Sequence, residues 1–395
     1  MRIVFDGSVC FDRFGACFHY YSELVPRLSR MGCHVTLTPS PTGALDSLRE
    51  QGASVAKPVL PGGGWIPPGK TRKALSKVKQ GLETYFLRRR LEREQELTLF
   101  QSFFYTLPPS PKFLLVGMIL DVIPEKFPDW YATENDRALL ARRRAYAERA
   151  QRFLAISECT KRDFSEAYNI PPSRIDVVPL GINLEAYLPR PAADLEVVRR
   201  QHGLDRPFFL QVGGRQKHKN FPLLARAFAQ SAVAKEFDLV CVGERWEPEE
   251  VVLLAELGLS QRVKLLRRPE EETLRCLYQC ASALAYPSLY EGFGLPPLEA
   301  MASGLPVAAS RGGSIPEVVG SAARLFDPTS TEDATRALEA VVQPQTASAL
   351  RAAGLARAAE FSWDRVAEQT WGVYRKLVST PARSSGQAAF LESPR

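Results

Sequence analysis

The segment from Tyr290 to Val307 reads "YEGFGLPPLEAMASGLPV". One short apolar run, "SALAYPS", precedes it, and another, "PVAAS", overlaps its end. Proline is excluded from a helix interior but suits the first turn, so we expect a helix to begin near Pro296. The preceding "YEGFGL" is then a loop that carries Glu291, and Glu299 lies in the first helical turn. Strand, loop, helix and strand follow one another, which is typical of parallel α/β architecture.

The same alternation of short apolar runs with amphipathic segments extends along almost the whole chain and predicts the α/β fold class. In the first half we expect strands at 2–6, 34–38, 97–102, 113–119, 152–157 and 175–180, and helices at 20–31, 137–150 and 160–168. In the second half we expect strands at 207–213, 237–243, 263–266, 281–287, 306–310 and 322–327. The helices expected there are 221–232, 272–281, 296–304 and 362–377.

The chain, at 395 residues, is too long for one ordinary core. The strand rhythm is interrupted over 181–206, so we predict one domain over 1–185 and a second over 186–362. Each would be a doubly wound, Rossmann-like domain, and the two would face each other across a cleft at the carboxyl ends of their strands. The last helix, 363–378, is expected to pack back on the first domain, and the Ser-, Ala- and Pro-rich tail, 379–395, to be disordered.

The composition, with 45% apolar and 24% charged residues, is that of a soluble globular protein. A net charge of +7 is compatible with an anionic substrate, a membrane surface or nucleic acid, and solubility alone explains it equally well. Seven scattered cysteines without a C-x-x-C pair argue against a disulfide scaffold and against zinc. No apolar run reaches the roughly 18 residues that span a bilayer, and the opening "MRIVFDGS" lacks a signal-peptide pattern. We expect a cytoplasmic protein, at most peripheral to the inner face of a membrane.

The segment 70–94 is basic beyond its surroundings, with nine Lys or Arg and three Glu, and its apolar residues recur at roughly helical spacing. A helix of this kind can lie on anionic lipid. A solvated helix face is the competing interpretation, and the one that we favour. Because the sequence contains no recognised DNA- or RNA-binding module, nucleic acid is not expected as a partner.

The two carboxylates of the opening segment, Glu291 and Glu299, are separated by seven residues that include Gly292 and Gly294. Glycines allow a ligand to approach the backbone closely, and a helix N-terminus presents unpaired N–H donors that suit phosphate. Carboxylates accept hydrogen bonds from the hydroxyls of sugars and ribose. An anion site between two such carboxylates predicts a nucleotide sugar as ligand. The competing interpretation is that Glu299 only offsets the helix dipole and that the glycines serve a turn.

A second segment, "LQVGGRQKHKNFPLLARAFA" at 210–229, combines a strand, the glycine turn Gly213–Gly214, a basic cluster and a helix. Arg215 can hold a diphosphate by its planar fork, and Lys219 can do so as a point charge. Ordinary surface basicity is the alternative, although it would be unfavourable near a helix start. The segment is not a dinucleotide-binding fingerprint, because no G-x-G-x-x-G follows a strand.

The string "PSLYEGFGLPPLEAMASGLPVAAS" (287–310) closely resembles the signature of the retaining GT-B glycosyltransferases with the glutamate, seven residues, glutamate motif (glycosyl transferases group 1, family 4). The resemblance implies that Glu291 contacts the transferred sugar and that Glu299 holds the nucleotide ribose. It implies that Arg215 and Lys219 bind the donor diphosphate. The segment 312–320, "GGSIPEVVG", also resembles a family segment, interpreted as a wall of the donor cleft. The remaining donor-site residues would be Gly213, Gly214, Gly292, Phe293, Gly294 and Leu295.

The first half resembles the same family but departs from it in one region. In "FDRFGACFHYYSEL" (11–24), Gly15 and Ala16 stand where the family has Gly-Gly, and His19 stands where it has Arg. In "MILDVIPEKFPDWY" (118–131), Leu120 replaces the expected histidine before the matching Asp121. At the end of another strand, where the family often has a histidine, this chain has Gln101. We expect Gly15, Ala16, His19 and Asp121 on the acceptor side of the cleft, where the changes bear on acceptor handling and turnover.

The sequence therefore predicts a retaining glycosyltransferase that moves a hexose, mannose-like by family precedent, from a GDP- or UDP-linked donor to a polysaccharide, glycolipid or other glycan acceptor. Its catalytic residues would be Glu291, Arg215 and Lys219. The resemblance implies that no cofactor or metal is needed, because members of this class stabilise the leaving diphosphate with basic side chains and a helix N-terminus. The sequence agrees, since it has no Asp-x-Asp. The main alternative is a nucleotide-sugar-binding pseudo-enzyme or non-catalytic partner subunit. A sugar phosphorylase or epimerase of the same fold is a third.

Overall fold

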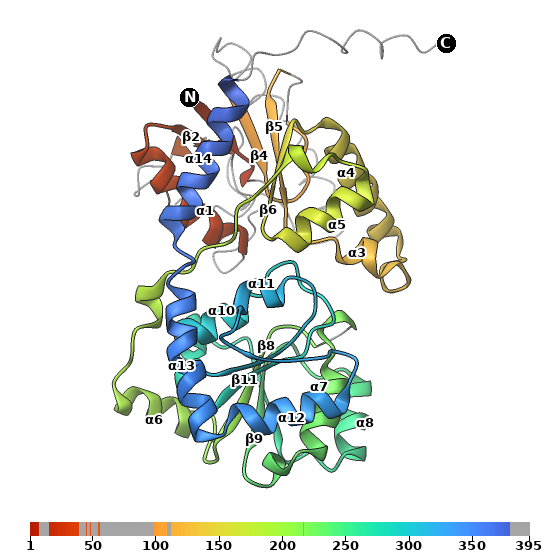
Figure 1. Cartoon of the computed structure of the whole chain (residues 1–395), viewed down its shortest axis with the longest axis vertical. Helices are drawn as coiled ribbons and strands as arrows, with labels where there is room; N and C mark the ends of the chain where they lie inside the picture. The colour runs from red at the N-terminus through yellow and green to blue at the C-terminus, as the bar shows by residue number, and fades with distance from the viewer. Residues whose placement is uncertain are drawn as a thin grey trace, which may run out of the picture. The chain divides into compact units, whose positions relative to one another are not determined.

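The computed structural model describes residues 1–7, 16–38, 45, 48, 54–55, 98–108, 112–215 and 217–379. The predicted Gly15, the basic segment 70–94 and the tail from 380 onward lie outside these residues. Within the described part, the strands form two sheets (Figure 1). Both expected fold features, strands alternating with helices and parallel pairing, are confirmed.

The first sheet has the strand order β3-β2-β1-β4-β5-β6-β7. β1 lies between β2 and β4 and is parallel to both, with Ile3 opposite Val35 and Leu99. The order reverses at β1 and β4, as in doubly wound folds. The strands are β1 (Arg2–Phe5), β2 (His34–Leu37), β3 (Ser54–Val55), β4 (Thr98–Ser102), β5 (Leu114–Ile119), β6 (Arg152–Ala155) and β7 (Ile175–Val177). The helices of this part are α1 (Ala16–Arg30), α3 (Ile123–Lys126), α4 (Glu134–Arg149) and α5 (Glu158–Tyr168).

The second sheet has the order β10-β9-β8-β11-β12-β13 and repeats the same doubly wound pattern. β8 reads "FFLQV" and β11 reads "ALAY", and all nine of these residues are buried, as expected for strands covered on both faces. The strands are β8 (Phe208–Val212), β9 (Asp238–Gly243), β10 (Val263–Arg267), β11 (Ala283–Tyr286), β12 (Val307–Ser310) and β13 (Arg324–Phe326).

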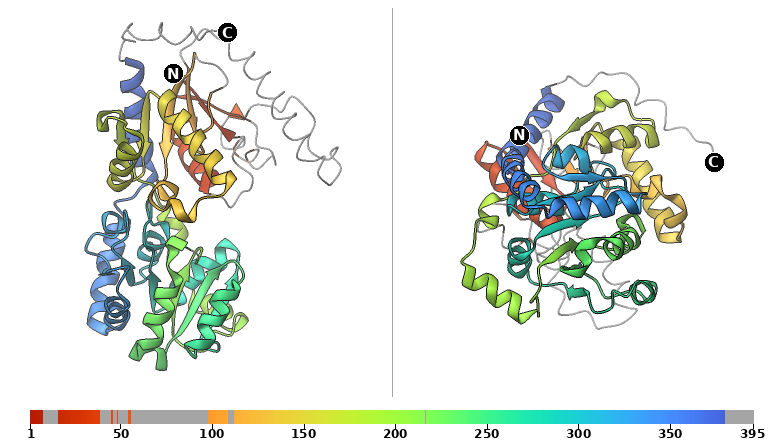
Figure 2. Two further views of the ribbon diagram at one scale, coloured as in Figure 1. Left: turned by 90° about the vertical axis from the view of Figure 1, so that its right-hand side faces the viewer. Right: turned by 60° about the horizontal axis from the view of Figure 1, so that its bottom comes forward.

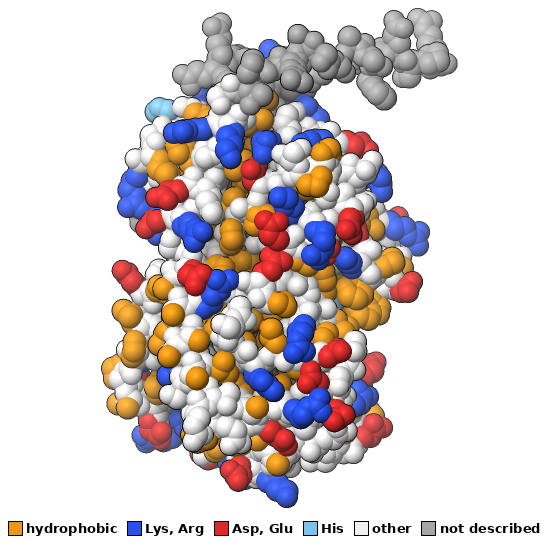
Figure 3. Space-filling model, in the orientation of Figure 1, with side chains coloured by type: hydrophobic (Ala, Val, Ile, Leu, Met, Phe, Trp, Pro, Cys, Tyr) orange, Lys and Arg blue, Asp and Glu red, His pale blue; other side chains and the backbone are white. Residues whose placement is uncertain are grey.

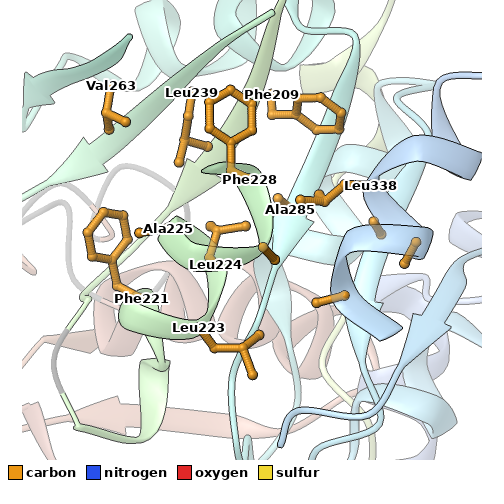
Figure 4. Close-up of a cluster of buried hydrophobic side chains, with 14 of the residues drawn as sticks. Phe209, Phe221, Leu223, Leu224, Ala225, Phe228, Leu239, Val263, Ala285 and Leu338 are labelled. Atoms are coloured by element: carbon orange, nitrogen blue, oxygen red, sulfur yellow. The ribbon is translucent and has the colours of Figure 1, made fainter. Parts of the chain in front are cut away.

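Helices cover both faces of this second sheet (Figures 1 and 2). On one face α7 packs against α12 and α8, and on the other α10 packs against β11, β12 and α13. Phe209, Phe228, Leu224 and Leu338 are buried together in the core of the first of these faces (Figure 4). The helices are α6 (Ala192–Gln201), α7 (Phe221–Gln230), α8 (Pro248–Glu256), α9 (Glu271–Cys280), α10 (Leu295–Ala302), α11 (Ile315–Val319), α12 (Thr331–Val341), α13 (Pro344–Ala358) and α14 (Trp363–Ser379).

The chain divides into two compact units. The first comprises the described parts of Met1–Met118, Tyr146–Phe153 and Ala367–Arg395, and the second comprises Ile119–Ala145 and Leu154–Val366. In the first unit, the Tyr374 hydroxyl on α14 donates to the side-chain carbonyl of Gln101 on β4. The domain limits at 185 and 362 were predicted from the spacing of the expected strands. They differ from the boundaries of these compact units and stay a prediction.

The face of the molecule in Figure 3 carries basic and acidic side chains interspersed, rather than one continuous field of either sign. This face therefore shows no large basic patch, although the whole chain has a net charge of +7. Among the described residues, no helix is long and apolar enough to cross a membrane.

Candidate donor site

The two predicted donor segments follow neighbouring strands of the second sheet. β8 pairs with β11, with Leu210 opposite Leu284, so the loops after these strands leave the sheet side by side. The strand order reverses between β8 and β11, and ligands of doubly wound sheets bind at this switch point, beyond the carboxyl ends of the strands. We call the two segments the β8 loop (residues 213–220) and the β11 loop (residues 287–294).

The β8 loop and the β11 loop are bonded to each other. The Asn220 side-chain amide donates to the carbonyl of Pro287 at 3.1 Å, and the Leu289 N–H donates to the carbonyl of His218 at 2.7 Å. Asn220 precedes α7 with φ +57°, a left-handed conformation that asparagine tolerates better than most residues. Two segments that the sequence analysis treated separately therefore form one structural unit.

The Glu291 carboxylate is the point on which side chains of both loops converge. Its Oε1 accepts from Lys219 Nζ at 2.8 Å, from the Tyr286 hydroxyl at 2.7 Å and from the Ser288 hydroxyl at 2.6 Å. Within the described part of the chain, all three donors contact Oε1 and none contacts Oε2. Glu291 is buried, yet it keeps one carboxylate oxygen with acceptor capacity for a ligand.

Tyr286 remains a dependable hydrogen-bond donor to this carboxylate. Burial, together with the negative charge of Glu291, raises the pKa of the Tyr286 phenol well above its ordinary value. The phenol is therefore protonated at neutral pH and donates to Glu291. Neither Tyr286 nor Ser288 was assigned a role from the sequence, because a strand-end tyrosine and a loop serine give no pattern of their own.

The backbone of the β11 loop is supported from behind by the segment 312–314. The Ser314 hydroxyl donates to the carbonyls of Glu291 and Phe293, at 3.0 and 2.9 Å. Gly313 has φ +59°, and a Cβ added there would lie 2.4 Å from the Glu291 carbonyl oxygen. This Gly-Gly-Ser segment, predicted as a wall of the donor cleft, thus contacts the glutamate loop directly and fixes its course.

The glycines of the β11 loop meet different requirements. A Cβ at Gly292 would lie 1.8 Å from the carbonyl oxygen of Leu120, so this glycine admits a neighbouring part of the same compact unit. Asp121, the predicted acceptor-side residue that follows, is adjacent, because its Cβ would be 3.0 Å from the same added atom. Gly294 caps α10 with φ +112°, and Phe293 beside it is buried. Leu295 is the first residue of that helix.

The predicted diphosphate ligand Arg215 is buried, with 1% of its surface exposed, so the alternative of ordinary surface basicity is wrong for it. Its guanidinium forms an ion pair with Glu250 of α8, with Nη2 3.1 Å from Oε2, and lies 4.4 Å from the centre of the Trp246 ring. The Arg215 side chain is therefore fixed by contacts with Glu250 and Trp246, which lie outside the β8 loop. The turn before it is half-buried at Gly213 and Gly214, and Gly213 has φ +107° with open space where a Cβ would stand.

Glu299 lies further along α10 than expected. The helix begins at Leu295, one residue before the predicted start, so Glu299 is its fifth residue and lies just beyond the first turn, in which it was predicted to lie. The reason is that Gly294 caps the helix, which lets it start before the two prolines. The Tyr278 hydroxyl of α9 donates to Glu299 Oε2 at 2.6 Å. The Glu299 charge also contributes, after burial, to a raised pKa at Tyr187, so both tyrosines lie near this carboxylate.

The remaining acceptor-side candidates belong to the first unit. Gln101 is buried, and its amide nitrogen lies 3.3 Å from the Tyr20 hydroxyl, while its carbonyl accepts from Tyr374. The residue that replaces an expected histidine is thus part of the packing of this unit. His19 is half-buried on α1, which begins at Ala16. Among the described residues, no group of three or more His, Cys, Asp and Glu side chains could hold a metal ion.

Comparison with known protein families gives two matches that together cover most of the chain. "Glycosyltransferase Family 4" matches residues 19–186, and "Glycosyl transferases group 1" matches residues 195–355. The second match includes both the β8 loop and the β11 loop.

Curated relatives include an MMP alpha-(1->4)-mannosyltransferase of Mycolicibacterium hassiacum, 34% identical over 60% of this chain and 56% of that protein. They also include the O-antigen chain mannosyltransferase B of Escherichia coli, 30% identical over 63% of this chain and 67% of that protein. The chain thus spans little more than half the length of the first of these relatives.

Solved structures show the same fold at low sequence identity. A glycosyltransferase from Rickettsia africae superposes with a TM-score of 0.71 and 14% identity, over 96% of this chain and 99% of that one. Anabaena Alr3699/HepE, solved with UDP and glucose, superposes with a TM-score of 0.69 and 18% identity, over 95% of this chain and all of that one. The family matches and the relative from Escherichia coli establish that the chain belongs to the group 1 glycosyltransferases.

Proposed function

We propose that the protein transfers a mannose-like hexose from a GDP- or UDP-linked donor to a glycan acceptor, with retention of configuration and without a metal ion. The arrangement of Glu291 carries the proposal. Three protein donors hold Oε1 in place, and Oε2 remains available to a sugar hydroxyl. A buried carboxylate with one satisfied and one available oxygen suits the orientation of a polar ligand. The names of the relatives, several of them mannosyltransferases, favour mannose as the sugar.

Lys219 would supply the positive charge that the leaving diphosphate requires. In the structure its ammonium is 2.8 Å from Glu291 and about a quarter exposed, so it can exchange this partner for a phosphate oxygen. We propose that Arg215 of the same loop also contributes positive charge, while its pairing with Glu250 fixes its side chain. Preorganised positive groups of this kind are usually a large share of enzymatic rate enhancement. They give the chain a means of stabilising the diphosphate with its own residues.

The proposed reaction exchanges one bond at the anomeric carbon for another. The bond from this carbon to the diphosphate oxygen breaks, and a bond to the acceptor oxygen forms on the same face. The acceptor proton passes to the departing diphosphate. Glu291 orients the sugar, Glu299 holds the ribose with Tyr278 as its fixed partner, and the amides of the β11 loop contact the sugar and phosphates.

A donor screen tests this proposal. Purified protein is incubated with GDP-mannose, UDP-glucose and related donors and with a panel of glycan acceptors, and nucleotide diphosphate release is followed. We expect acceptor-dependent release with at least one mannose donor, and NMR of the product should show the anomeric configuration of the donor. Release only in the presence of an added metal, or an inverted product, would contradict the corresponding part of the proposal.

A second candidate function is a nucleotide-sugar-binding subunit without transferase activity. The observation that favours it is Gln101, which stands where the family commonly has a histidine and is committed to the packing of the first unit. The same screen separates the two, because tight donor binding with no release for any donor and acceptor would favour the binding subunit.

A further inference from the structure

A short aromatic segment, Phe127 to Tyr131, lies beside the β8 loop within the second compact unit. The rings of Phe127 and Trp130 are stacked, 4.7 Å apart and 12° from parallel. Phe127 covers one face of the indole, yet 36% of Trp130 remains exposed. A large aromatic ring that is stacked on a neighbour and still more than one third exposed offers an apolar surface to a ligand.

This segment is bonded to the β8 loop at successive residues. The Lys217 ammonium donates to the Trp130 carbonyl and lies 4.4 Å from the centre of the Tyr131 ring. The Tyr131 hydroxyl is 3.2 Å from His218 Nδ1. Lys217 adopts φ +52°, a conformation that costs a non-glycine residue about 1 kcal/mol or more. Lys219, two residues after Lys217, forms the ion pair with Glu291, so the aromatic segment adjoins the donor site.

Tyr131 and His218 are both uncharged at neutral pH. Burial, followed by the negative charges of Asp121, Asp136 and Glu291, raises the pKa of the Tyr131 phenol. Burial and the positive charge of Lys219 lower the pKa of His218 below its ordinary value. A neutral phenol and a neutral imidazole each combine a donor with an acceptor, which is the combination that a sugar hydroxyl requires.

We propose that Trp130, Tyr131 and His218 form the subsite for the acceptor sugar. The exposed part of the Trp130 ring would stack on the C–H groups of a hexose, whose weakly positive hydrogens favour the electron-rich ring face. The Tyr131–His218 pair would hold a hydroxyl of the same sugar. This inference rests on the proposed function, because transfer requires the acceptor oxygen to approach the sugar that Glu291 orients. His218 adjoins Lys219, which pairs with Glu291, and the Glu291 charge acts on the imidazole, so the proposed subsite lies near the carboxylate that would orient the sugar.

The test uses the full chain, the best donor from the screen and methyl α-D-mannopyranoside as the acceptor probe. We expect Trp130→Ala to raise the acceptor KM about tenfold, which corresponds to a loss of about 1.4 kcal/mol of binding free energy. Trp130→Phe should restore most of the affinity. Tyr131→Phe and His218→Gln should each raise the acceptor KM by about three- to tenfold. The donor Kd, measured by calorimetry, should move by less than twofold in all four variants.

Leu355→Ala provides the matched control, because Leu355 is also a large, exposed apolar residue but lies on α13. This variant should keep the wild-type acceptor KM. If Trp130→Ala also kept it while donor binding was intact, the subsite would be overturned. An equal rise in donor Kd and acceptor KM would also overturn it, because that result would indicate a general disturbance of the loop.

Ligand-observed NMR of the same probe separates this inference from the proposed function. If wild-type protein binds the probe and Trp130→Ala does not, the subsite stands even where no donor is turned over. If transfer occurs but neither binding nor KM responds to Trp130→Ala, the proposed function stands and the subsite is wrong. If wild-type protein shows no binding of the probe by either method, the subsite is also overturned.

Discussion

The Lys219 ammonium and the Glu291 carboxylate form an ion pair, with 2.8 Å between Nζ and Oε1, although 72 residues separate them in the chain. Sheet topology brings them together, because β8 and β11 are neighbours and each of these residues follows one of the two strands. Charge, hydroxyl donors and backbone support all converge on this pair. The predictions below therefore concern the groups that hold it.

Removing either hydroxyl donor should weaken the orientation of Glu291 without unfolding the protein. For Tyr286→Phe and Ser288→Ala we expect kcat to fall about three- to tenfold each, which is less than the roughly 1.5–3 kcal/mol of a hydrogen bond to a charged group, because two of the three donors to Oε1 remain in each variant. The double variant should lose more than the product of the single losses, because Lys219 would then be the only remaining donor. Nucleotide diphosphate release measures this. Wild-type kcat in the double variant would show that Oε1 needs no fixed orientation.

Gly292→Ala should disrupt the β11 loop, because the new Cβ would lie 1.8 Å from the backbone oxygen of Leu120, which cannot move aside as a side chain can. We expect a loss of about 1–3 kcal/mol of stability, the usual range for overpacking, together with loss of transfer. Gly372→Ala is the control, because nothing lies within 4 Å of its added Cβ on α14. It should be neutral or stabilise by up to about 1 kcal/mol. Urea unfolding compares the two variants.

Arg215 and Glu250 should depend on each other for stability, because both ends of this ion pair are buried. Glu250→Gln leaves a guanidinium charge in a buried environment, and breaking such pairs typically costs about 3–5 kcal/mol. Arg215→Lys should also destabilise, since lysine cannot reproduce the fork that contacts both oxygens of Glu250. Thermal unfolding of both variants provides the measurement. Unchanged midpoints would mean that the pair is not a structural element of the β8 loop.

The pKa of His218 lies below its ordinary value of 6.5, so the unfolded chain takes up this proton at a higher pH than the native protein does. Stability from this group is complete above about pH 6.5 and is lost as the pH falls through the native pKa. The acceptor KM should rise over the same range. His218→Gln should flatten both pH profiles below about pH 6.5. If the variant kept the wild-type fall in stability and rise in acceptor KM at acidic pH, a group other than His218 would be responsible. The charged and titratable groups around the imidazole are Lys217, Lys219, Glu291, Asp121 and Tyr131.

Much of this architecture was predictable from the sequence, because strands buried on both faces read as continuous apolar runs. Every strand expected in the second half is present within a few residues, from β8 to β13. The ion pair between Lys219 and Glu291 could not be predicted from the sequence, since a side-chain contact depends on which strands become neighbours. Glu299 lies just beyond the first turn, rather than in it as predicted, because Gly294 caps α10, which therefore begins one residue before Pro296.

Other contacts give no local signal in a single sequence. The pairing of Arg215 with Glu250 depends on where α8 packs, and "GGRQKHKN" alone suggests exposed basic residues. Tyr131 ends the segment 118–131 and His218 lies within the segment 210–229, 87 residues further on, and nothing in either segment indicates that the two side chains meet. The loss of histidine at Leu120 was visible in the sequence, whereas the presence of another imidazole near Asp121 and Glu291 became evident only in the folded chain.

The most direct test of the donor site is nucleotide diphosphate release by wild-type protein, Lys219→Ala and Glu291→Ala under the same conditions, with GDP-mannose and an active acceptor. Circular dichroism confirms that each variant is folded. The account predicts release by the wild type and a fall in kcat of about 10²–10³ in each variant, the usual effect of removing one preorganised electrostatic contact. Two folded variants that both release the nucleotide at the wild-type rate would contradict it.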